Sequence, residues 1–349
     1  MSTFTRRHLV ISTLSAAAGT AVVSALGVPA AFAQANPGAS PAASPVVTDT
    51  FPVTVPHVYG ETVIEAAPAH VVTIGWSTQD AVIALGVDPV GIPFQAWDGD
   101  ADGFLPWTRA ALEGRTLPAT FNTDTGIPFE DIIGLNPDVI LAPYSGITQD
   151  EYDTLSQIAP TVAYPEVAWG TSWQDDQTIT GQALGMSAAA EKLVSDTETL
   201  IASQTDKYPQ IKGKTFAYGN MGDGTTFNFY TTTDIRSIFL TAIGLVPSDF
   251  TKSMDKQAGP EKYFATVSFE LAATVDADIV AMWFGNEDEY KKAQDVSAFQ
   301  AISAVKENRF VAVVGEDLVM ASSAFSVLSI PYMLDRFIPS LAAAADNVK

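Results

Sequence analysis

Short runs rich in β-branched residues alternate with stretches of helical character along most of the chain, and this alternation limits the possible folds more than any other feature. Val71-Val72-Thr73-Ile74-Gly75 is typical of a strand, and a helix is predicted to follow it from Ser77 to Gly86. The other predicted elements of this half are strands at 90–93, 138–142 and 161–164 and helices at 129–135 and 148–158. Such alternation indicates βαβ units on mainly parallel sheets.

The second half repeats the alternation after Pro209 and Gly213. Its predicted elements are strands at 215–218, 278–283 and 310–314, helices at 234–244 and 287–307, and a C-terminal helix at 327–345 that Pro331 and Pro339 break or kink. Between the halves, apolar residues recur with a period close to 3.6 over 178–205, which predicts one long helix. The predicted fold is therefore α/β, with two Rossmann-like lobes at 57–177 and 206–349 joined by that helix.

One short pattern occurs once in each half. Phe129-Glu130 is followed, eight residues after the Glu, by Asp138 and a predicted strand, and Phe269-Glu270 is followed at the same spacing by Asp278 and a predicted strand. Chance similarity between two ordinary helix–strand units would also produce this match. The preferred interpretation is two lobes of like topology, each with a helix that starts on a Glu.

The N-terminal segment is predicted to be an export signal. Arg6 and Arg7 precede an Ala-rich apolar run, and Ala31-Phe32-Ala33 supplies a small-x-small cleavage pattern, so 1–33 resembles a twin-arginine signal peptide. An uncleaved membrane anchor is the alternative, disfavoured because the run contains little Leu. Residues 34–56 are rich in Pro, Ala and Ser and are predicted to be a disordered linker.

Charge and rare residues exclude several functions. The chain has 40 acidic and 18 basic residues and a net charge of −22, which excludes a basic nucleic-acid surface. It has no Cys, so thiolate metal sites, Cys nucleophiles and the lipid attachment of a lipobox are excluded. Only three His residues are present, which disfavours a His-rich zinc site or a His-dependent triad.

Aromatic side chains follow many of the predicted strands. Ligands of open α/β sheets bind beyond the carboxyl ends of strands, so these aromatics are candidates to pack a bulky, partly apolar ligand. Arg236 begins a helix of the second lobe and could bind an oxygen-rich ligand, although pairing with Asp234 explains it equally well. Each aromatic taken singly could equally be core or rim. The candidate ligand-binding residues are Trp76, Phe94, Trp97, Tyr144, Trp169, Tyr218, Arg236 and Trp283.

This organisation resembles the substrate-binding proteins of ABC importers for iron–siderophore complexes and vitamin B12. The resemblance covers about 60–345 and rests on 71–91, 129–143, the helix at 178–205, 269–283 and 309–335. It implies a ligand cleft between two lobes that a rigid helix joins. It also implies that Glu130 and Glu270 project from the two lobes and meet arginines of a permease dimer, which works with an ATPase. The local alternative is that each carboxylate stabilises the first turn of its own helix.

The resemblance implies a monomeric, exported carrier in the periplasm or at the cell surface, which binds iron only through its chelator. A ferric hydroxamate is favoured because the chain has few basic residues for an anionic catecholate or citrate complex, and haem or cobalamin is the alternative within the family. A secreted hydrolase is the alternative of another class. Ser253-Met254-Asp255-Lys256 matches Ser-x-x-Lys, but no Gly-x-Ser-x-Gly or His-Glu-x-x-His is present, so we expect no catalysis.

Overall fold

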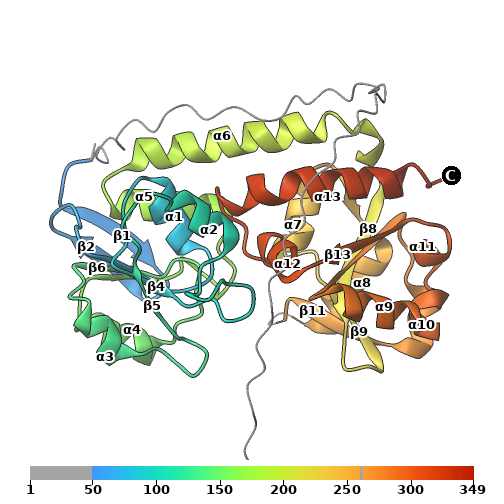
Figure 1. Cartoon of the computed structure of the whole chain (residues 1–349), viewed down its shortest axis with the longest axis horizontal. Coiled ribbons are helices and arrows are strands. Elements are labelled where there is room, and N and C mark those ends of the chain that lie inside the picture. The colour runs from blue at the N-terminus through green and yellow to red at the C-terminus, as the bar shows by residue number, and fades with distance from the viewer. Residues whose placement is uncertain (1–48, 260–261) are drawn as a thin grey trace, which may run out of the picture. The chain divides into compact units, whose positions relative to one another are not determined.

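The structure is a computed structural model that describes residues 49–259 and 262–349. The predicted signal at 1–33 and the first part of the predicted linker, 34–48, lie outside the described residues. No helix within the described part is both long and apolar enough to cross a membrane. Figure 1 shows two α/β lobes, with helix α6 running along both of them.

The N-terminal lobe follows the predicted order of strands and helices, with several additional elements. Its elements are β1 (Val53–His57), β2 (Gly60–Ile64), β3 (Val71–Thr73), α1 (Thr78–Ala84), β4 (Gly91–Pro93), α2 (Pro106–Ala111), β5 (Ala119–Phe121), α3 (Phe129–Gly134), β6 (Val139–Leu141), α4 (Gln149–Leu155), β7 (Thr161–Val162) and α5 (Trp173–Ala183). All pairings in the five-stranded sheet β5-β4-β3-β6-β7 are parallel. Strand β3 is buried on both faces, as expected when helices cover both sides of a parallel sheet.

The strand order creates a crevice in this lobe. From β3 the chain first builds β4 and β5 on one side, and then returns to build β6 and β7 on the other. The connections that follow β3 and β4 therefore diverge from the one that follows β6 at the carboxyl edge of the sheet. Reversals of this kind are where open α/β sheets bind ligands.

The last residues of the predicted disordered linker, which was expected to extend to residue 56, are folded. Residues 53–57 form β1, which pairs antiparallel with β2. Val53 and Val55 point into the core of the lobe, so the alternation of apolar and polar residues that starts there is that of a half-buried strand. Farther upstream, the backbone N–H of Asp49 donates to the Gly185 carbonyl (3.0 Å), so the folded region already includes Asp49.

The C-terminal lobe contains a mixed sheet. Its elements are η1 (Pro209–Ile211), β8 (Thr215–Met221), β9 (Thr226–Tyr230), α7 (Ile235–Ala242), β10 (Val246–Pro247), α8 (Asp249–Ala258), β11 (Phe264–Ser268), η2 (Phe269–Thr274), β12 (Ile279–Phe284), α9 (Glu287–Gln294), α10 (Ser297–Ala301), α11 (Ser303–Lys306), β13 (Phe310–Val314), α12 (Glu316–Ala321) and α13 (Ser329–Ala345). Strands β10, β8, β12 and β13 pair parallel, whereas β9 pairs antiparallel with β8 and β11. Neither β9 nor β11 was predicted; between them the sequence indicated only the helix at 234–244.

The single helix predicted at 178–205 is wrong, because two helices occupy that segment. Helix α5 ends at Ala183 and α6 runs from Ser187 to Thr205. Gly185 has a φ of +70°, its N–H donates to the Gln182 carbonyl, and the Met186 N–H donates to the Gly181 carbonyl. This is a Schellman ending, which only glycine forms without backbone strain. The apolar period continues across it because both helices bury side chains in the same lobe.

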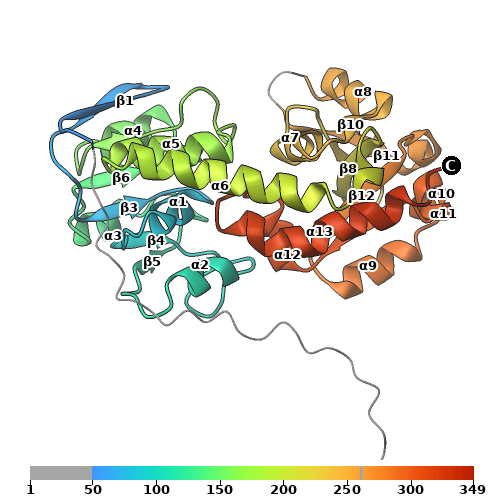
Figure 2. The same ribbon diagram turned by 90° about the horizontal axis from the view of Figure 1, so that it is seen from above.

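Helix α6 is the element shared by the two lobes. Ala190 near its start packs in the core of the N-terminal lobe, and Ile201 in its last turns packs in the core of the C-terminal lobe. Figure 2 shows α6 beside both α5 and α13. Its 19 residues span about 28 Å, enough to extend from one lobe to the other.

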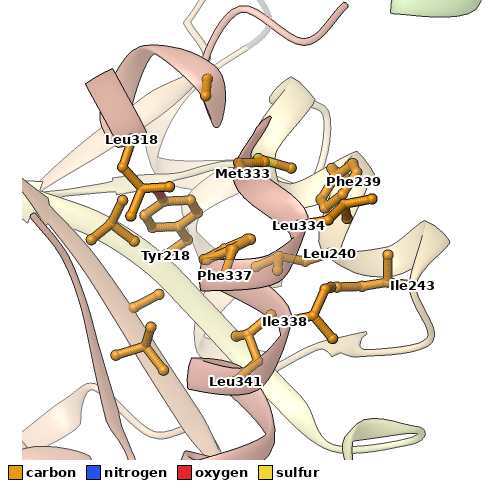
Figure 3. Packing of buried hydrophobic residues seen from close by; sticks show 14 of the residues in the cluster. Tyr218, Phe239, Leu240, Ile243, Leu318, Met333, Leu334, Phe337, Ile338 and Leu341 are labelled. Atoms are coloured by element: carbon orange, nitrogen blue, oxygen red, sulfur yellow. The ribbon is translucent and has the colours of Figure 1, made fainter. Parts of the chain in front are cut away.

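The last helix carries much of the C-terminal core. Met333, Leu334, Phe337, Ile338 and Leu341 of α13 are buried against β8 and α7 (Figure 3). The predicted breaks at the two prolines of this helix do not occur. Pro331 lies in the first turn, where a backbone N–H has no partner within the helix, and Pro339 is followed by residues that the core holds in place. By contrast, the helix predicted at 287–307 is divided into α9, α10 and α11.

The pattern found in both halves of the sequence has a structural counterpart. The Asp138 carboxylate accepts the backbone N–H of His70 just before β3 (2.9 Å), and the Asp278 carboxylate accepts the N–H of Thr215 at the start of β8 (2.8 Å). Each Asp thus joins the start of its own strand to the start of the neighbouring central strand. The two lobes use the same device, although the Phe-Glu pair begins an α-helix, α3, in one lobe and a 3₁₀ helix, η2, in the other.

Candidate functional site

A pocket of about 510 Å³ lies between the two lobes. Its N-terminal wall comes from residues that follow β3, β4 and β5, and its C-terminal wall comes from α7, β12 and α12 with the residues just after it. The strand order therefore places the pocket at the carboxyl edge of the N-terminal sheet. Its lining residues are Trp76, Pro93, Phe94, Gln95, Ala96, Trp97, Thr123, Asp124, Arg236, Trp283, Val319, Met320 and Ser323.

Two tryptophans of the N-terminal wall are well exposed. Trp76 and Trp97 expose 42% and 43% of their surface, which is unusual for side chains of this size. Trp76 packs on Trp169 with ring centroids 5.0 Å apart, and Trp97 meets Trp283 of the opposite lobe edge-to-face at 6.1 Å. These aromatic surfaces face solvent inside the pocket, where a ligand could cover them.

Gly75 determines how the residues after β3 approach those after β6. It has a φ of +114°, and a Cβ atom there would lie 2.1 Å from the carbonyl oxygen of Tyr144. Any other residue at this position would force the two connections apart. Gly75 therefore allows Trp76 to emerge directly from the end of the central strand β3.

Arg236 is the basic side chain of this pocket. Its Nε donates to Ser323 Oγ (3.1 Å) and its Nη1 to Asp234 Oδ2 (2.8 Å), and the guanidinium carbon lies 4.2 Å from the Tyr230 ring centroid. No hydrogen bond among the described residues uses Nη2, so this nitrogen has a free donor. Asp234, which caps α7, is almost fully buried beside it and balances its charge. Arg236 therefore pairs with Asp234 and also lines the pocket.

Trp283 is the aromatic anchor of the C-terminal wall. It lies on β12, and its indole Nε1 donates to the hydroxyl of Tyr230 (2.7 Å). Tyr230 ends β9 and is only 4% exposed, so the contact is made behind the pocket surface. The indole is thus held from within the lobe while part of its surface remains accessible.

Five of the eight predicted ligand-binding residues line the pocket: Trp76, Phe94, Trp97, Arg236 and Trp283. The prediction that Tyr218 contacts the ligand is wrong, because its side chain is 1% exposed and packs against Phe337 and Leu318 under α13 (Figure 3). The strand was predicted to end at Tyr218, but β8 continues to Met221, so Tyr218 lies in the middle of the strand on the face that the C-terminal helix covers.

Trp169 and Tyr144 do not line this pocket either. Trp169 is about as exposed as Trp76, and the two rings pack against each other. Tyr144 is buried and borders a second pocket of about 420 Å³, which lies against α6 and α7. That second pocket is walled mainly by apolar side chains such as Ile201, Ile238 and Phe239. Its one lysine, Lys212, is paired with Asp206 at 2.7 Å.

Sequence reasoning missed several pocket residues. Asp124 follows β5, a strand of three residues that the sequence pattern did not indicate. Val319, Met320 and Ser323 come from α12 and its end, within a segment where no helix was predicted. Asp124 therefore had no signal of its own in the sequence, because the strand that it follows was not indicated.

The charge of the pocket region is not positive. Arg236 is balanced by Asp234, and Asp124 adds a carboxylate to the lining. Beside Trp97, burial and the nearby carboxylate of Glu316 raise the pKa of Asp98 to about 7. An anionic ligand would therefore meet little net attraction here.

Glu130 and Glu270 are both exposed, in the first turns of α3 and η2. Neither is hydrogen-bonded through its carboxylate to another described residue, so both could contact another protein. No cluster of three or more His, Asp or Glu side chains suited to a metal ion occurs within 49–259 and 262–349.

Comparison with known proteins places the chain in a family. The model of the periplasmic binding protein family matches residues 71–314, most of the chain. A probable siderophore-binding lipoprotein of Bacillus subtilis, YfiY, is 25% identical over 280 residues, which are 78% of this chain and 82% of that protein. The Fe(3+) dicitrate-binding periplasmic protein FecB of Escherichia coli is 25% identical over 274 residues, 77% of this chain and 84% of that protein.

One solved structure has a higher sequence identity to this chain than these two relatives. The structure of Streptococcus pneumoniae PiaA in complex with ferrichrome is 32% identical, has a TM-score of 0.76, and covers 85% of this chain and 100% of its own. The region that the family model matches, 71–314, includes both of the larger sheets and the pocket residues from Trp76 to Trp283, whereas Val319, Met320 and Ser323 follow it. YfiY is named as a lipoprotein and FecB as a periplasmic protein, and both names describe proteins outside the cytoplasm. The chain belongs to the periplasmic binding protein family, whose two-lobed fold it shares.

Proposed function

We propose that this protein captures a ferric hydroxamate siderophore in the inter-lobe pocket and delivers it to an ABC permease for iron uptake. The observation that carries the proposal is the combination of exposed aromatic surface with one charge-balanced guanidinium, in a pocket at the carboxyl edge of the N-terminal sheet. Three of the six tryptophans of the chain line this pocket.

The chemistry of a ferric trishydroxamate suits such a lining. Its iron is fully coordinated by the chelator, so the protein supplies no metal ligand and needs only to recognise the outer surface of the complex. That surface is mostly apolar with a few hydroxamate oxygens. Trp76, Trp97 and Trp283 would pack on the apolar part, and the free Nη2 of Arg236 would donate to an oxygen.

The balance of charge favours hydroxamates over citrate or catecholate complexes. Ferric citrate and ferric catecholate complexes are anionic, so binding would remove water from their charges. The described residues of the pocket offer no unpaired cation in return, because Arg236 already pairs with Asp234. The ferrichrome complex of PiaA supports the hydroxamate class, whereas the name of FecB makes ferric citrate the ligand to test against it. Haem and cobalamin remain as further comparisons.

Delivery would use the exposed carboxylates of Glu130 and Glu270. One stands on each lobe, so together they would set the register of a docked permease dimer through carboxylate–guanidinium pairs. The protein would act as an exported monomer, in the periplasm or at the cell surface. Iron would enter and leave only inside its chelator, and ATP hydrolysis by the partner ATPase would drive release.

The test is tryptophan fluorescence of the mature protein, titrated in parallel with ferrichrome, a ferric catecholate, ferric citrate, haem and cobalamin. Ferrichrome should quench saturably with micromolar or tighter affinity, and the same titration of Trp76→Phe/Trp283→Phe should lose most of the quenching. Trp107→Phe is the matched control, because Trp107 is buried away from the pocket. Tighter binding of citrate, haem or cobalamin would reject the hydroxamate assignment, and no saturable response to any ligand would reject the carrier function.

A further inference from the structure

Tyr230 contacts two lining residues of the C-terminal wall without lining the pocket itself. Its hydroxyl oxygen accepts the indole N–H of Trp283 at 2.7 Å, and its ring lies under the guanidinium of Arg236 at 4.2 Å. The side chain is 4% exposed and packs on Tyr218 with ring centroids 5.6 Å apart. Tyr230 therefore belongs to the rigid core on one side and touches the pocket wall on the other.

The hydroxyl of Tyr230 is itself held in place. The side-chain amide of Asn220 on β8 lies 3.3 Å from Tyr230 Oη. When the amide oxygen faces the tyrosine, it accepts hydrogen bonds from the Tyr230 hydroxyl (3.3 Å) and from Trp283 Nε1 (3.2 Å), while the amide nitrogen donates to the Met221 carbonyl at 2.8 Å. A chain of donors then runs from Trp283 through Tyr230 to Asn220, and every buried group in it has a partner.

We propose that Tyr230 is a positioning residue, which fixes the indole of Trp283 at the orientation in which it contacts the ligand. This inference rests on the proposed function and names a residue that would act through Trp283 without touching the ligand. Without the Oη acceptor, the Trp283 N–H would lose its shorter hydrogen bond of 2.7 Å and keep only the longer contact of 3.2 Å to the Asn220 amide oxygen. The indole would then sample other rotamers, and ligand binding would have to restrict them again.

The position of Trp283 across the lobes makes its orientation important. Its ring meets Trp97 of the N-terminal lobe edge-to-face, with an interplanar angle of 74°. A rotation of the indole would alter the contact with Trp97 and the shape of the pocket between them. Tyr230 thus affects both the ligand surface and one of the contacts between the lobes.

The first test needs no ligand. In ¹⁵N-labelled protein, the indole N–H signal of Trp283 is identified by its loss in Trp283→Phe. In Tyr230→Phe this signal should move upfield and exchange faster with solvent, because the shorter of its two hydrogen bonds is gone while the phenyl ring under Arg236 remains. Tyr218→Phe is the matched control, since it removes a neighbouring core hydroxyl that lies 3.5 Å from Ser322 Oγ and that accepts no hydrogen bond from the Trp283 indole. An unchanged Trp283 signal in Tyr230→Phe would overturn the proposal.

The second test is a double-mutant cycle with ferrichrome, measured by calorimetry. Tyr230→Phe should weaken binding about three- to tenfold, the range of one hydrogen bond, and Tyr218→Phe should change it less than about twofold. In the Trp283→Phe background, Tyr230→Phe should have almost no further effect. Equal losses in both backgrounds, or no loss in either, would overturn the positioning role. If the wild type binds none of the ferric chelates, the proposed function fails instead, and the ligand-free signal still reports whether Tyr230 holds Trp283.

Discussion

The carboxylate of Asp80 in the N-terminal lobe accepts a hydrogen bond of 2.7 Å from the hydroxyl of Ser326 in the C-terminal lobe. Asp80 lies in the first turn of α1 and is fully buried, and it also accepts from Trp107 Nε1 and Thr108 Oγ1. Ser326 Oγ in turn accepts the N–H of Ser329, the first residue of α13. The start of the last helix is thus attached to the first lobe by a buried, charged acceptor.

Removing the Ser326 hydroxyl should weaken this attachment. Ser326→Ala leaves the buried carboxylate with two donors and should lower the free energy of unfolding by about 1–3 kcal/mol, as for hydrogen bonds to charged groups. The measurement is urea denaturation followed by circular dichroism. Ser322→Ala, whose hydroxyl donates to the neutral Val319 carbonyl, is the control and should cost less. An equal or larger cost for Ser322→Ala would contradict the special role of Asp80.

Two buried carboxylates make stability depend on pH. Burial raises the pKa of Asp176 to about 7 and that of Asp80 to about 6, although hydroxyl donors oppose the shift in both. In the unfolded chain both titrate near 4, so the folded state binds more protons between about pH 4 and 7. The stability that each protonated group contributes is therefore present below about pH 4 and is lost as pH rises through the folded pKa.

Asp176→Asn should flatten this part of the profile. The melting temperature of the variant should fall less than that of the wild type between pH 4.5 and 8, because the amide does not ionise. The difference between the two profiles isolates Asp176 from groups of opposite sign, such as His57, whose pKa burial lowers. Asp175→Asn changes an exposed neighbour and should keep the wild-type profile. Parallel profiles for the wild type and Asp176→Asn would show that Asp176 does not titrate in this range.

Arg236 should contribute to affinity through its free donor. Because Arg236→Gln alone would leave Asp234 buried without its cation, the test variant is Asp234→Asn/Arg236→Gln, in which Asn still caps α7. Ferrichrome binding should weaken about tenfold or more, in line with a charge-assisted hydrogen bond. Arg109→Gln is the control, because Arg109 pairs with Asp100 and Asp102 and does not line this pocket. Equal affinity in the double variant and the wild type would remove Arg236 from the site.

Charge reversal at the two exposed glutamates should separate binding from transport. Glu130→Lys/Glu270→Lys should bind ferrichrome with wild-type affinity, because neither residue lines the pocket, and should abolish uptake of ⁵⁵Fe-ferrichrome by cells. Glu113→Lys/Glu191→Lys makes the same change of charge at two other exposed positions and should support normal uptake. Normal uptake by the Glu130/Glu270 variant would reject the docking role.

The order of strands and helices was predictable because each element has a local signal. Val71-Val72-Thr73 is β-branched, and Phe129-Glu130 starts a helical turn on an acidic residue. Elements without such a signal were missed, among them the two-residue strand β10 and the short β5. The division between α5 and α6 had a signal in Gly185, but the apolar period continues through it and obscured the break.

The candidate site was predictable in part, because strand ends can be found in a sequence and the direction of a side chain there cannot. Trp76 and Trp283 follow or end strands and do reach the pocket. Tyr218 also lies on a strand, but its side chain points to the face that α13 covers, and α13 is more than 100 residues away along the chain. Tyr230 and Asn220 had no signal of their own, since their role depends on Trp283 coming beside them.

By itself the sequence determined the two α/β halves and the acidic composition without thiols, because composition and periodicity are properties of single segments. The order and spacing of its motifs supplied the resemblance to the family. Only the tertiary structure decided which strand-end side chains share one pocket, how Arg236 is balanced by Asp234, and how Asp80 and Ser326, 246 positions apart in the chain, join the two lobes. These are relations between distant segments. Packing determines these relations, because burial of the apolar faces of both sheets fixes the direction of each side chain.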